Sequence, residues 1–321
     1  MSPNAFSVHI LYGAIGFDNN LKGYIPMKNT VFTGAGVAII TPFRDGKIDY
    51  EDFARIIEFQ IANGTDAIVV CGTTGEASTL SDEEHIDAIE FTVKQTAGRI
   101  PVIAGTGSND TAYAIWLTKE ACRVGADALL VVTPYYNKAS VKGLINHFTA
   151  IADASTKPII LYNVPSRTGC NIPLSVYREL AKHPMIVATK EASGNMSAIA
   201  ELIAELGDQL DVYSGNDDQI VPILSLGGKG VISVLSNVMP RETHDICQLY
   251  FDGKVKESAA LQLKLLDLIN NLFIEVNPIP VKAAMNLMGY CTKEVRPPMC
   301  EPEEAHLEIL KASMVKHSLL S

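Results

Sequence analysis

The chain has 321 residues, of which 47% are hydrophobic and 19% are charged, so it is long enough to bury a large core, and barrels of ~250 residues commonly form one domain. A net charge of −10 argues against a surface that binds nucleic acid or anionic membranes. No apolar run approaches the ~18–20 residues that a membrane-spanning helix needs. The six cysteines are scattered without a C-x-x-C pair, so we expect neither a zinc site nor a disulfide framework, and free thiols in a reducing cytoplasm.

The first 26 residues differ in pattern from those that follow. A mildly apolar stretch at Ala5–Phe17 has no basic segment before it and no A-x-A cleavage site after it, so it does not predict a secretory signal. Met27 is a candidate natural start. We therefore expect residues 1–26 to be an extension, disordered or added to the natural protein, followed by a main domain at 27–251 and a C-terminal helical region at 252–321.

From Thr33 onward, segments typical of strands and of helices alternate along the chain. Short runs that are apolar on both faces predict buried parallel strands. These are expected at Gly36–Thr41, Ala67–Cys71, Pro101–Ala104, Ala128–Val132, Pro158–Tyr162, Ile186–Lys190, Asp211–Tyr213 and Gly230–Val234. Apolar residues at helical spacing predict a helix after each strand and three more toward the C-terminus. These are expected at Tyr50–Ile61, Ser81–Gln95, Thr111–Val124, Val141–Ala154, Leu174–Ala181, Met196–Leu206, Gln219–Leu226, Arg241–Phe251, Val255–Phe273, Pro280–Met288 and Glu303–Val315.

Eight strands that each precede a helix predict an α/β fold in which a parallel sheet closes into a TIM (β/α)8 barrel. Asp49 is placed to cap the first helix, and Ser81 with Glu84 forms a capping box on the second. A doubly wound open sheet is the alternative, but the first strand runs into T-P-F-R-D-G rather than a Gly-rich phosphate turn. The last helices exceed what a barrel needs, so we expect a C-terminal helical appendage or an oligomer surface.

In a barrel, the functional site lies at the carboxyl ends of the strands. Polar side chains follow five of the predicted strands. The segments are Gly72–Glu76, Thr133–Asn137, Leu161–Gly169, Lys190 and Ser214–Asp218. Any one of them suits a solvated loop, but together they bring threonines, tyrosines, an arginine and a lysine to one rim.

Lys190 ends an apolar strand and is the central residue of this set. Side chains alternate along a strand, so Ile186, Ala188 and Lys190 are expected on one inward face. A lysine desolvated there has a lowered pKa and can attack a carbonyl carbon. The alternative is a lysine that leaves the strand for solvent, as most lysines do.

Three neighbouring features support chemistry at this rim. The hydroxyls of Thr73 and Thr74, between glycines, can bind a carboxylate or an oxyanion, although a plain turn also explains them. Tyr162 faces inward and can move a proton near a lysine, or it can serve as a hydrogen-bonding rim residue. Arg167 has the fork that suits a substrate carboxylate, or it is a surface charge.

Two other patterns are set aside. Gly227–Gly230 (GGKG) resembles a phosphate loop but lacks the remaining P-loop positions, and it places Lys229 at the opposite end of the barrel. Four histidines lie on predicted helices or at their ends without metal-ligand spacing, so we expect them to be structural and expect no metal. They are His85, His147, His183 and His244.

Five segments resemble, in order and at appropriate separations, the motifs of the dihydrodipicolinate synthase family, pyruvate-dependent class I aldolases that include N-acetylneuraminate lyase. They are GTTGE at 72–76, VTPYYN at 132–137, LYNVPSRTG at 161–169, KEASGN at 190–195 and SGNDD at 214–218. The resemblance covers Met27 to the C-terminus. It implies a barrel with a C-terminal helical region, a cytoplasmic homotetramer of tight dimers, and condensation of pyruvate with L-aspartate-4-semialdehyde in the diaminopimelate route to lysine. Such chemistry needs a lysine, a proton relay and anion donors, but no cofactor.

The resemblance also implies roles for individual residues. Lys190 would form the Schiff base with pyruvate, and Tyr162, Thr73 and Tyr136 would relay protons, with Tyr136 reaching across the tight dimer interface. Thr74, Gly215 and the backbone around Ile232 would hold the pyruvate, and Arg167 would hold the carboxylate of the semialdehyde. Sialic-acid lyases resemble the chain less, because they lack the arginine in the YNVPSRTG loop.

Many family members carry a lysine-feedback site at the tight dimer interface. The matching residues here are Ala77, Ser78, His85, Asn109, Tyr113 and Tyr135. Lysine-sensitive members commonly have a glutamate where this chain has Tyr113, and often a histidine where it has Asp82. We therefore expect weak or absent inhibition by lysine.

Two alternatives to the synthase reaction stay open. One is another pyruvate-dependent aldolase of the same family, acting on keto acids or sugar acids. The other is a non-catalytic member that binds a small ketoacid, against which the presence of Lys190, Tyr162 and Thr73 argues.

Overall fold

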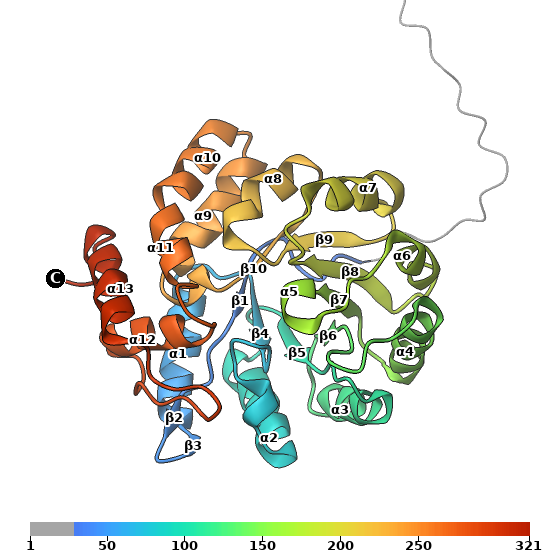
Figure 1. Cartoon of the computed structure of the whole chain (residues 1–321), viewed down its shortest axis with the longest axis horizontal. Coiled ribbons are helices and arrows are strands. Elements are labelled where there is room, and N and C mark those ends of the chain that lie inside the picture. Colours follow the sequence, from blue (N-terminus) through green and yellow to red (C-terminus); the bar gives the residue numbers. More distant parts are fainter. Residues whose placement is uncertain (1–28) are drawn as a thin grey trace, which may run out of the picture.

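The computed structural model describes residues 29–321, so the expectation for residues 1–26 falls outside the described residues. Its parallel strands close into a barrel, in the order β1-β10-β9-β8-β7-β6-β5-β4 (Figure 1). The strands are β1 Gly34–Ala38, β4 Ala67–Val70, β5 Val102–Gly105, β6 Ala128–Val132, β7 Ile159–Asn163, β8 Ile186–Glu191, β9 Asp211–Ser214 and β10 Gly230–Ser233. The predicted TIM barrel is confirmed.

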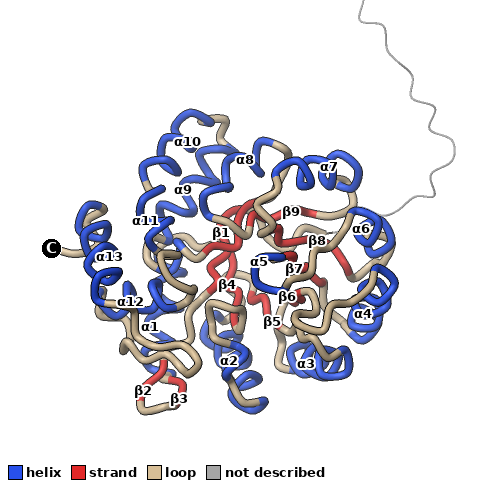
Figure 2. Tube along the Cα trace, viewed as in Figure 1, coloured by secondary structure: helices blue, strands red, loops and turns tan. Residues whose placement is uncertain are grey.

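Helices connect the strands and surround the barrel, as the tube view shows (Figure 2). They are α1 Tyr50–Ala62, α2 Asp82–Thr96, α3 Thr111–Arg123, α4 Val141–Ala154, α5 Pro165–Thr168, α6 Leu174–Leu180, α7 Met196–Leu206, α8 Ile220–Ser225 and α9 Pro240–Phe251. Both predicted caps form: Asp49 accepts from two backbone N–H groups of α1, and Ser81 and Glu84 make a reciprocal capping box on α2. The starts of these two helices were therefore predictable from local sequence.

The barrel has two apolar layers that follow the alternation of each strand. On β7, Ile160 and Tyr162 face the interior, while Ile159 and Leu161 pack against the surrounding helices. On β8, the predicted inward face is wrong at its first residue: Ile186 belongs to the outer layer. The pairing of β7 with β8 slips between Ile159 and Ile160, and this irregularity reverses the alternation before Ala188 and Lys190.

The first strand differs from its prediction because its neighbours set its length. Strand β1 pairs with β10 and β4 only over Gly34–Ala38, not Gly36–Thr41. After the end of β1, the backbone N–H of Ile40 donates to the side-chain oxygen of Asn237 and not to a neighbouring strand. A short hairpin that the sequence pattern missed, β2 Phe43–Arg44 with β3 Lys47–Ile48, follows.

The C-terminal helices gather on one side of the barrel (Figure 1). They are α10 Val255–Lys264, α11 Leu266–Asn271, α12 Ile279–Leu287 and α13 Glu304–Lys316. The helix predicted at 255–273 is thus two helices that meet at Leu265. Between α11 and α12, the segment 273–277 reaches the barrel mouth and lines its cavity. Across residues 29–321, no helix combines the length and apolarity needed to cross a membrane.

Candidate functional site

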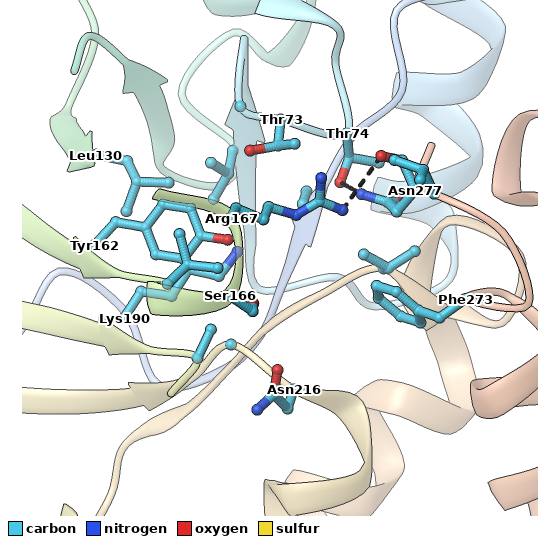
Figure 3. Close-up of a pocket in the computed structure, with 18 of the residues that line it drawn as sticks. Thr73, Thr74, Leu130, Tyr162, Ser166, Arg167, Lys190, Asn216, Phe273 and Asn277 are labelled. Atoms are coloured by element: carbon cyan, nitrogen blue, oxygen red, sulfur yellow. Dashed lines mark hydrogen bonds between the residues drawn. The ribbon is translucent and has the colours of Figure 1, made fainter. Parts of the chain in front are cut away.

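A cavity of about 610 Å³ opens where the barrel strands end (Figure 3). Its walls come from the loops after β4, β7 and β9, from the end of β8, and from the C-terminal segment 273–277. The lining residues are Ala38, Val69, Gly72, Thr73, Thr74, Leu130, Tyr162, Val164, Ser166, Arg167, Lys190, Ala192, Gly215, Asn216, Val234, Phe273, Ile274, Glu275, Val276 and Asn277. The structure therefore gathers Lys190, Tyr162, Thr73, Thr74 and Arg167, five predicted site residues that the sequence spreads over more than a hundred positions.

Lys190 lies in this cavity at the end of β8 and is only 6% exposed. Burial lowers the pKa of its ammonium group from 10.5 to about 8; the charge of Asp217 opposes this shift and that of Arg167 adds to it. A pKa near 8 gives a lysine an appreciable neutral fraction at neutral pH, and the neutral amine is the nucleophile.

Tyr162 stands beside Lys190 because their strands place them in register. The Lys190 Nζ lies 4.4 Å from the centre of the Tyr162 ring. Burial raises the pKa of the Tyr162 phenol to about 12, with Arg167 opposing this shift. The phenol is therefore protonated at neutral pH and can donate a hydrogen bond or a proton into the cavity.

The turn after β4 presents the two threonines. Thr73 is exposed in the cavity, while Thr74 is buried and accepts a hydrogen bond of 3.0 Å from the Asn277 side-chain amide. Arg167, on the short helix α5, reaches toward the same residue, and its guanidinium donates to the Asn277 carbonyl over 3.3 Å (Figure 3). The guanidinium is exposed at the mouth, where it can meet a carboxylate that enters from solvent.

Gly215 lies against the lysine. A Cβ at this position would lie 3.1 Å from Lys190 Cε and 2.7 Å from Ala192 Cβ, so a larger residue would push the nucleophile aside. Asp217, two residues on, is buried, and one carboxylate oxygen accepts from the backbone N–H groups of Val234 and Leu235. Burial raises the pKa of this carboxyl group.

Two predicted residues lie outside the cavity. Ile232 is fully buried in the barrel interior on β10, and its side chain does not line the cavity. Tyr136 has 89% of its surface exposed and a backbone φ of 75°, on the loop after β6. Tyr136 is not among the described residues that line the cavity.

A second cavity, of about 470 Å³, adjoins the first and shares six lining residues with it: Gly72, Thr73, Leu130, Tyr162, Val164 and Arg167. Five of the six residues predicted for regulation line it: Ala77, Ser78, His85, Tyr113 and Tyr135. Asn109 is not in the wall but donates to the Tyr135 carbonyl over 3.1 Å. Within this group, the Tyr113 hydroxyl donates to Asp82 over 2.8 Å.

Among residues 29–321, no group of three or more His, Cys, Asp or Glu side chains is arranged to hold a metal ion. The four histidines singled out from the sequence contact other groups instead: His85 the Gly105 carbonyl, His147 Thr111, His183 Asp153 and His244 Asp66. Lys229 precedes β10, at the end of the barrel opposite the cavity.

Sequence reasoning missed the segment 273–277, which supplies Asn277 to the cavity. Asn277 is buried, and its side-chain oxygen has no hydrogen-bond partner among residues 29–321. The one local signal was the Asn277-Pro278 dipeptide, which indicates a turn before α12 but gives no hint of a partner 203 positions away.

A parallel barrel with a buried lysine of lowered pKa at its mouth, beside a tyrosine and anion-binding side chains, defines the class of lysine-dependent barrel aldolases. The chain belongs to the dihydrodipicolinate synthetase family, which it matches over residues 31–317.

Two kinds of relatives agree with this assignment. A 4-hydroxy-tetrahydrodipicolinate synthase of Lachnoclostridium phytofermentans is 56% identical over 292 residues, which are 90% of this chain and 99% of the relative. The crystal structure of dihydrodipicolinate synthase from Aquifex aeolicus superposes with a TM-score of 0.88 at 47% identity, covering 90% of this chain and 99% of that one. A structure described as the first monomeric dihydrodipicolinate synthase variant gives a TM-score of 0.89 at 40% identity, covering 90% and 98%.

Proposed function

We propose that this enzyme is a lyase that condenses pyruvate with L-aspartate-4-semialdehyde, the 4-hydroxy-tetrahydrodipicolinate synthase reaction of the diaminopimelate route to lysine. The observation that carries the proposal is the pairing of Lys190, with its pKa lowered to about 8, and Tyr162 in a cavity that Arg167 borders. The name and 56% identity of the relative described above support the same reaction.

The chemistry follows from the lysine. The neutral Lys190 amine attacks C2 of pyruvate, and loss of water leaves a protonated imine. The positive nitrogen withdraws electrons, so the methyl carbon loses a proton and the resulting enamine attacks the aldehyde carbon of the semialdehyde. A new carbon–carbon bond forms, and the aldehyde oxygen takes up a proton. The amino group that came from the semialdehyde then attacks the imine carbon, which closes the ring, and Lys190 leaves as the free amine.

Each of these steps moves a proton, for which the site offers hydroxyl groups. The Tyr162 ring lies beside the Lys190 amine, and Thr73 lines the same cavity. Tyr136 would complete the relay from the partner subunit, because its exposed position suits a residue that crosses an interface. We therefore propose a homotetramer of tight dimers, in the cytoplasm, in which each site is completed by a second chain.

Two anion sites would hold the substrates. The Thr74 hydroxyl, with Gly215 and the backbone around Ile232, would bind the pyruvate carboxylate close to Lys190. Arg167, more exposed at the mouth, would bind the carboxylate of the semialdehyde. Bidentate binding by a guanidinium fixes the orientation of a carboxylate as well as its position.

We also propose that lysine inhibits this enzyme weakly or not at all. The second cavity carries Tyr113 where lysine-sensitive relatives have a glutamate, and a neutral phenol offers no charge to an ammonium group. The nearby Asp82 carboxylate is already engaged by the Tyr113 hydroxyl.

The substrate assignment is tested by assaying turnover of pyruvate with L-aspartate-4-semialdehyde and, in parallel, with sugar-acid aldehydes. We expect turnover with the semialdehyde, and in Arg167→Ala a KM that rises for the semialdehyde more than for pyruvate. Turnover with a sugar-acid aldehyde alone would assign the chain to another aldolase of the family, and a lack of turnover with every aldehyde would favour a ketoacid-binding protein.

A further inference from the structure

A buried ion pair ties the threonine turn to the C-terminal region. Glu76, which ends the turn, faces Lys282 of α12, 206 positions later, with 2.5 Å between Oε1 and Nζ. Both side chains are 0% exposed. The Lys282 ammonium also lies 4.0 Å from the centre of the Phe43 ring, which is itself fully buried.

The second oxygen of Glu76 is held from the same region. The backbone N–H of Arg296 donates to Glu76 Oε2 over 3.0 Å. The Arg296 guanidinium lies over the Phe43 ring and donates to both carboxylate oxygens of Glu84, at 2.7 and 2.6 Å. Glu76 thus receives both of these donors from the chain that follows the barrel, not from the barrel itself.

Stability alone is a weak explanation for such a pair. Burying two charges costs several kcal/mol, and well-packed apolar residues often replace a buried pair without loss of stability. Geometry is the better explanation here, because Glu76 has a left-handed backbone (φ 55°), which is unfavourable for residues other than glycine. The ion pair is thus made by the residue of the turn that has this unfavourable backbone conformation.

The turn is held at a second point by the same part of the chain. Asn277, five residues before Lys282, donates to Thr74 Oγ1 over 3.0 Å. On the barrel side, Thr41 donates to the Gly75 carbonyl over 2.7 Å. The turn therefore contacts this part of the chain on both sides of Gly75. Asn277 binds Thr74, and Lys282 of α12 binds Glu76. Thr73 lies between these contacts and the end of β4.

We propose that Glu76 and Lys282 are positioning residues, and that their ion pair places the Thr73 hydroxyl for proton transfer to and from the pyruvate imine. The inference rests on the pyruvate half-reaction of the proposed function and is independent of the second substrate. Misplacement of a relay group by about 1 Å can slow a reaction by about 100-fold, so the pair would act on rate without touching substrate.

The test separates imine formation from proton transfer. Borohydride trapping with pyruvate measures the fraction of subunits that form the imine, and NMR in D2O measures exchange of the pyruvate methyl protons. In Lys282→Met we expect parental trapping but methyl exchange slowed about 10- to 100-fold per imine-bearing subunit. Lys293→Met is the matched control, because Lys293 is an exposed lysine of the same region that pairs with Glu301, and we expect parental values.

The neutral double variant Glu76→Gln/Lys282→Met guards against misfolding, because it leaves no unpaired charge in the core. Slow exchange with full trapping in either variant supports the proposal. Two results would overturn it. In one, each imine-bearing subunit exchanges methyl protons at the parental rate. In the other, trapping and exchange both decrease in proportion to the fraction of folded protein. A parental protein that exchanges the methyl protons but does not consume the semialdehyde would refute the proposed second substrate alone, and one that traps no pyruvate would refute both.

Discussion

Lys190 gives up most of its hydration, with 6% of its surface exposed, and burial disfavours its charged form. The nearby Asp217 carboxylate limits the shift but does not cancel it, so the pKa settles at about 8. At pH 7 such a group is neutral in roughly one molecule in ten, against roughly one in 3,000 for an ordinary lysine of pKa 10.5. Burial thus increases the population of the nucleophile by more than two orders of magnitude.

The pH dependence of the pyruvate half-reaction follows from this pKa. The neutral amine is the reactive form, so kcat/KM for pyruvate should rise about tenfold per pH unit below pH 8 and level off above it. Tyr162 stays protonated over this range, because burial raises the pKa of its phenol to about 12. Stopped-flow rates of imine formation between pH 6 and 10 provide the measurement, and a rate that still rises at pH 10 would show an unshifted lysine.

At the scale of elements, most side chains of the site lie at the carboxyl ends of strands, and the segment 273–277 supplies a further part of the cavity wall. The ends of β4, β7, β8 and β9 were predictable, because an apolar run that stops at polar residues locates the rim of a barrel. The positions of Asn277 and Lys282 near the site could not be predicted from the sequence, because these residues reach the threonine turn only through tertiary contacts. The slip in β8 was equally hidden, since no local residue signals it and only pairing with β7 reveals it.

Gly215→Ala tests how tightly the loop after β9 packs on the nucleophile. A Cβ there would come within 3.1 Å of Lys190 Cε and the Glu191 carbonyl oxygen, so we expect kcat/KM for pyruvate to fall about 10- to 100-fold while the protein remains folded. Gly143→Ala is the control, because Gly143 lies in α4, and outside the backbone of that helix the described atoms nearest to a Cβ there are side-chain atoms of Ser140 and Ala139, at 3.3 and 3.5 Å. A Gly215→Ala variant with parental kcat/KM would show that the loop after β9 can shift to accept the methyl group without displacing Lys190.

At the scale of the whole molecule, the barrel was predictable because eight strand–helix units repeat one pattern. The lengths of the first strand and of the helices after the barrel could not be predicted. Strand β1 extends only as far as it pairs with its neighbours, and the helix expected at 255–273 is interrupted at Leu265. An isolated chain also leaves Tyr136 89% exposed. A complete site therefore requires assembly under the proposed mechanism.

Mixing two inactive variants tests that assembly. Lys190→Met removes the nucleophile and Tyr136→Phe removes the phenol, yet a hybrid dimer would contain one intact site. Random association of equal amounts should restore about a quarter of parental activity, since half of the dimers are hybrids with one of two sites complete. Activity that stays at the level of the separate variants would place Tyr136 in its own subunit's site or outside the chemistry.

Weak or absent inhibition by lysine is a separate expectation at this scale. We expect less than half inhibition at 1 mM lysine on the order-of-magnitude argument that a lost partner charge weakens binding about tenfold or more. Tyr113→Glu is the informative variant, because it restores a carboxylate to the second cavity and should increase sensitivity. Strong inhibition of the parental protein at sub-millimolar lysine would contradict the expectation.

The most direct test of the account is borohydride reduction in the presence of pyruvate, followed by peptide mass analysis. We expect one reduced pyruvyl adduct, on Lys190, and none in Lys190→Met. The absence of an adduct on folded protein would contradict the Schiff-base mechanism, and an adduct on Lys229, at the opposite end of the barrel, would place the chemistry on the wrong face of the structure described above.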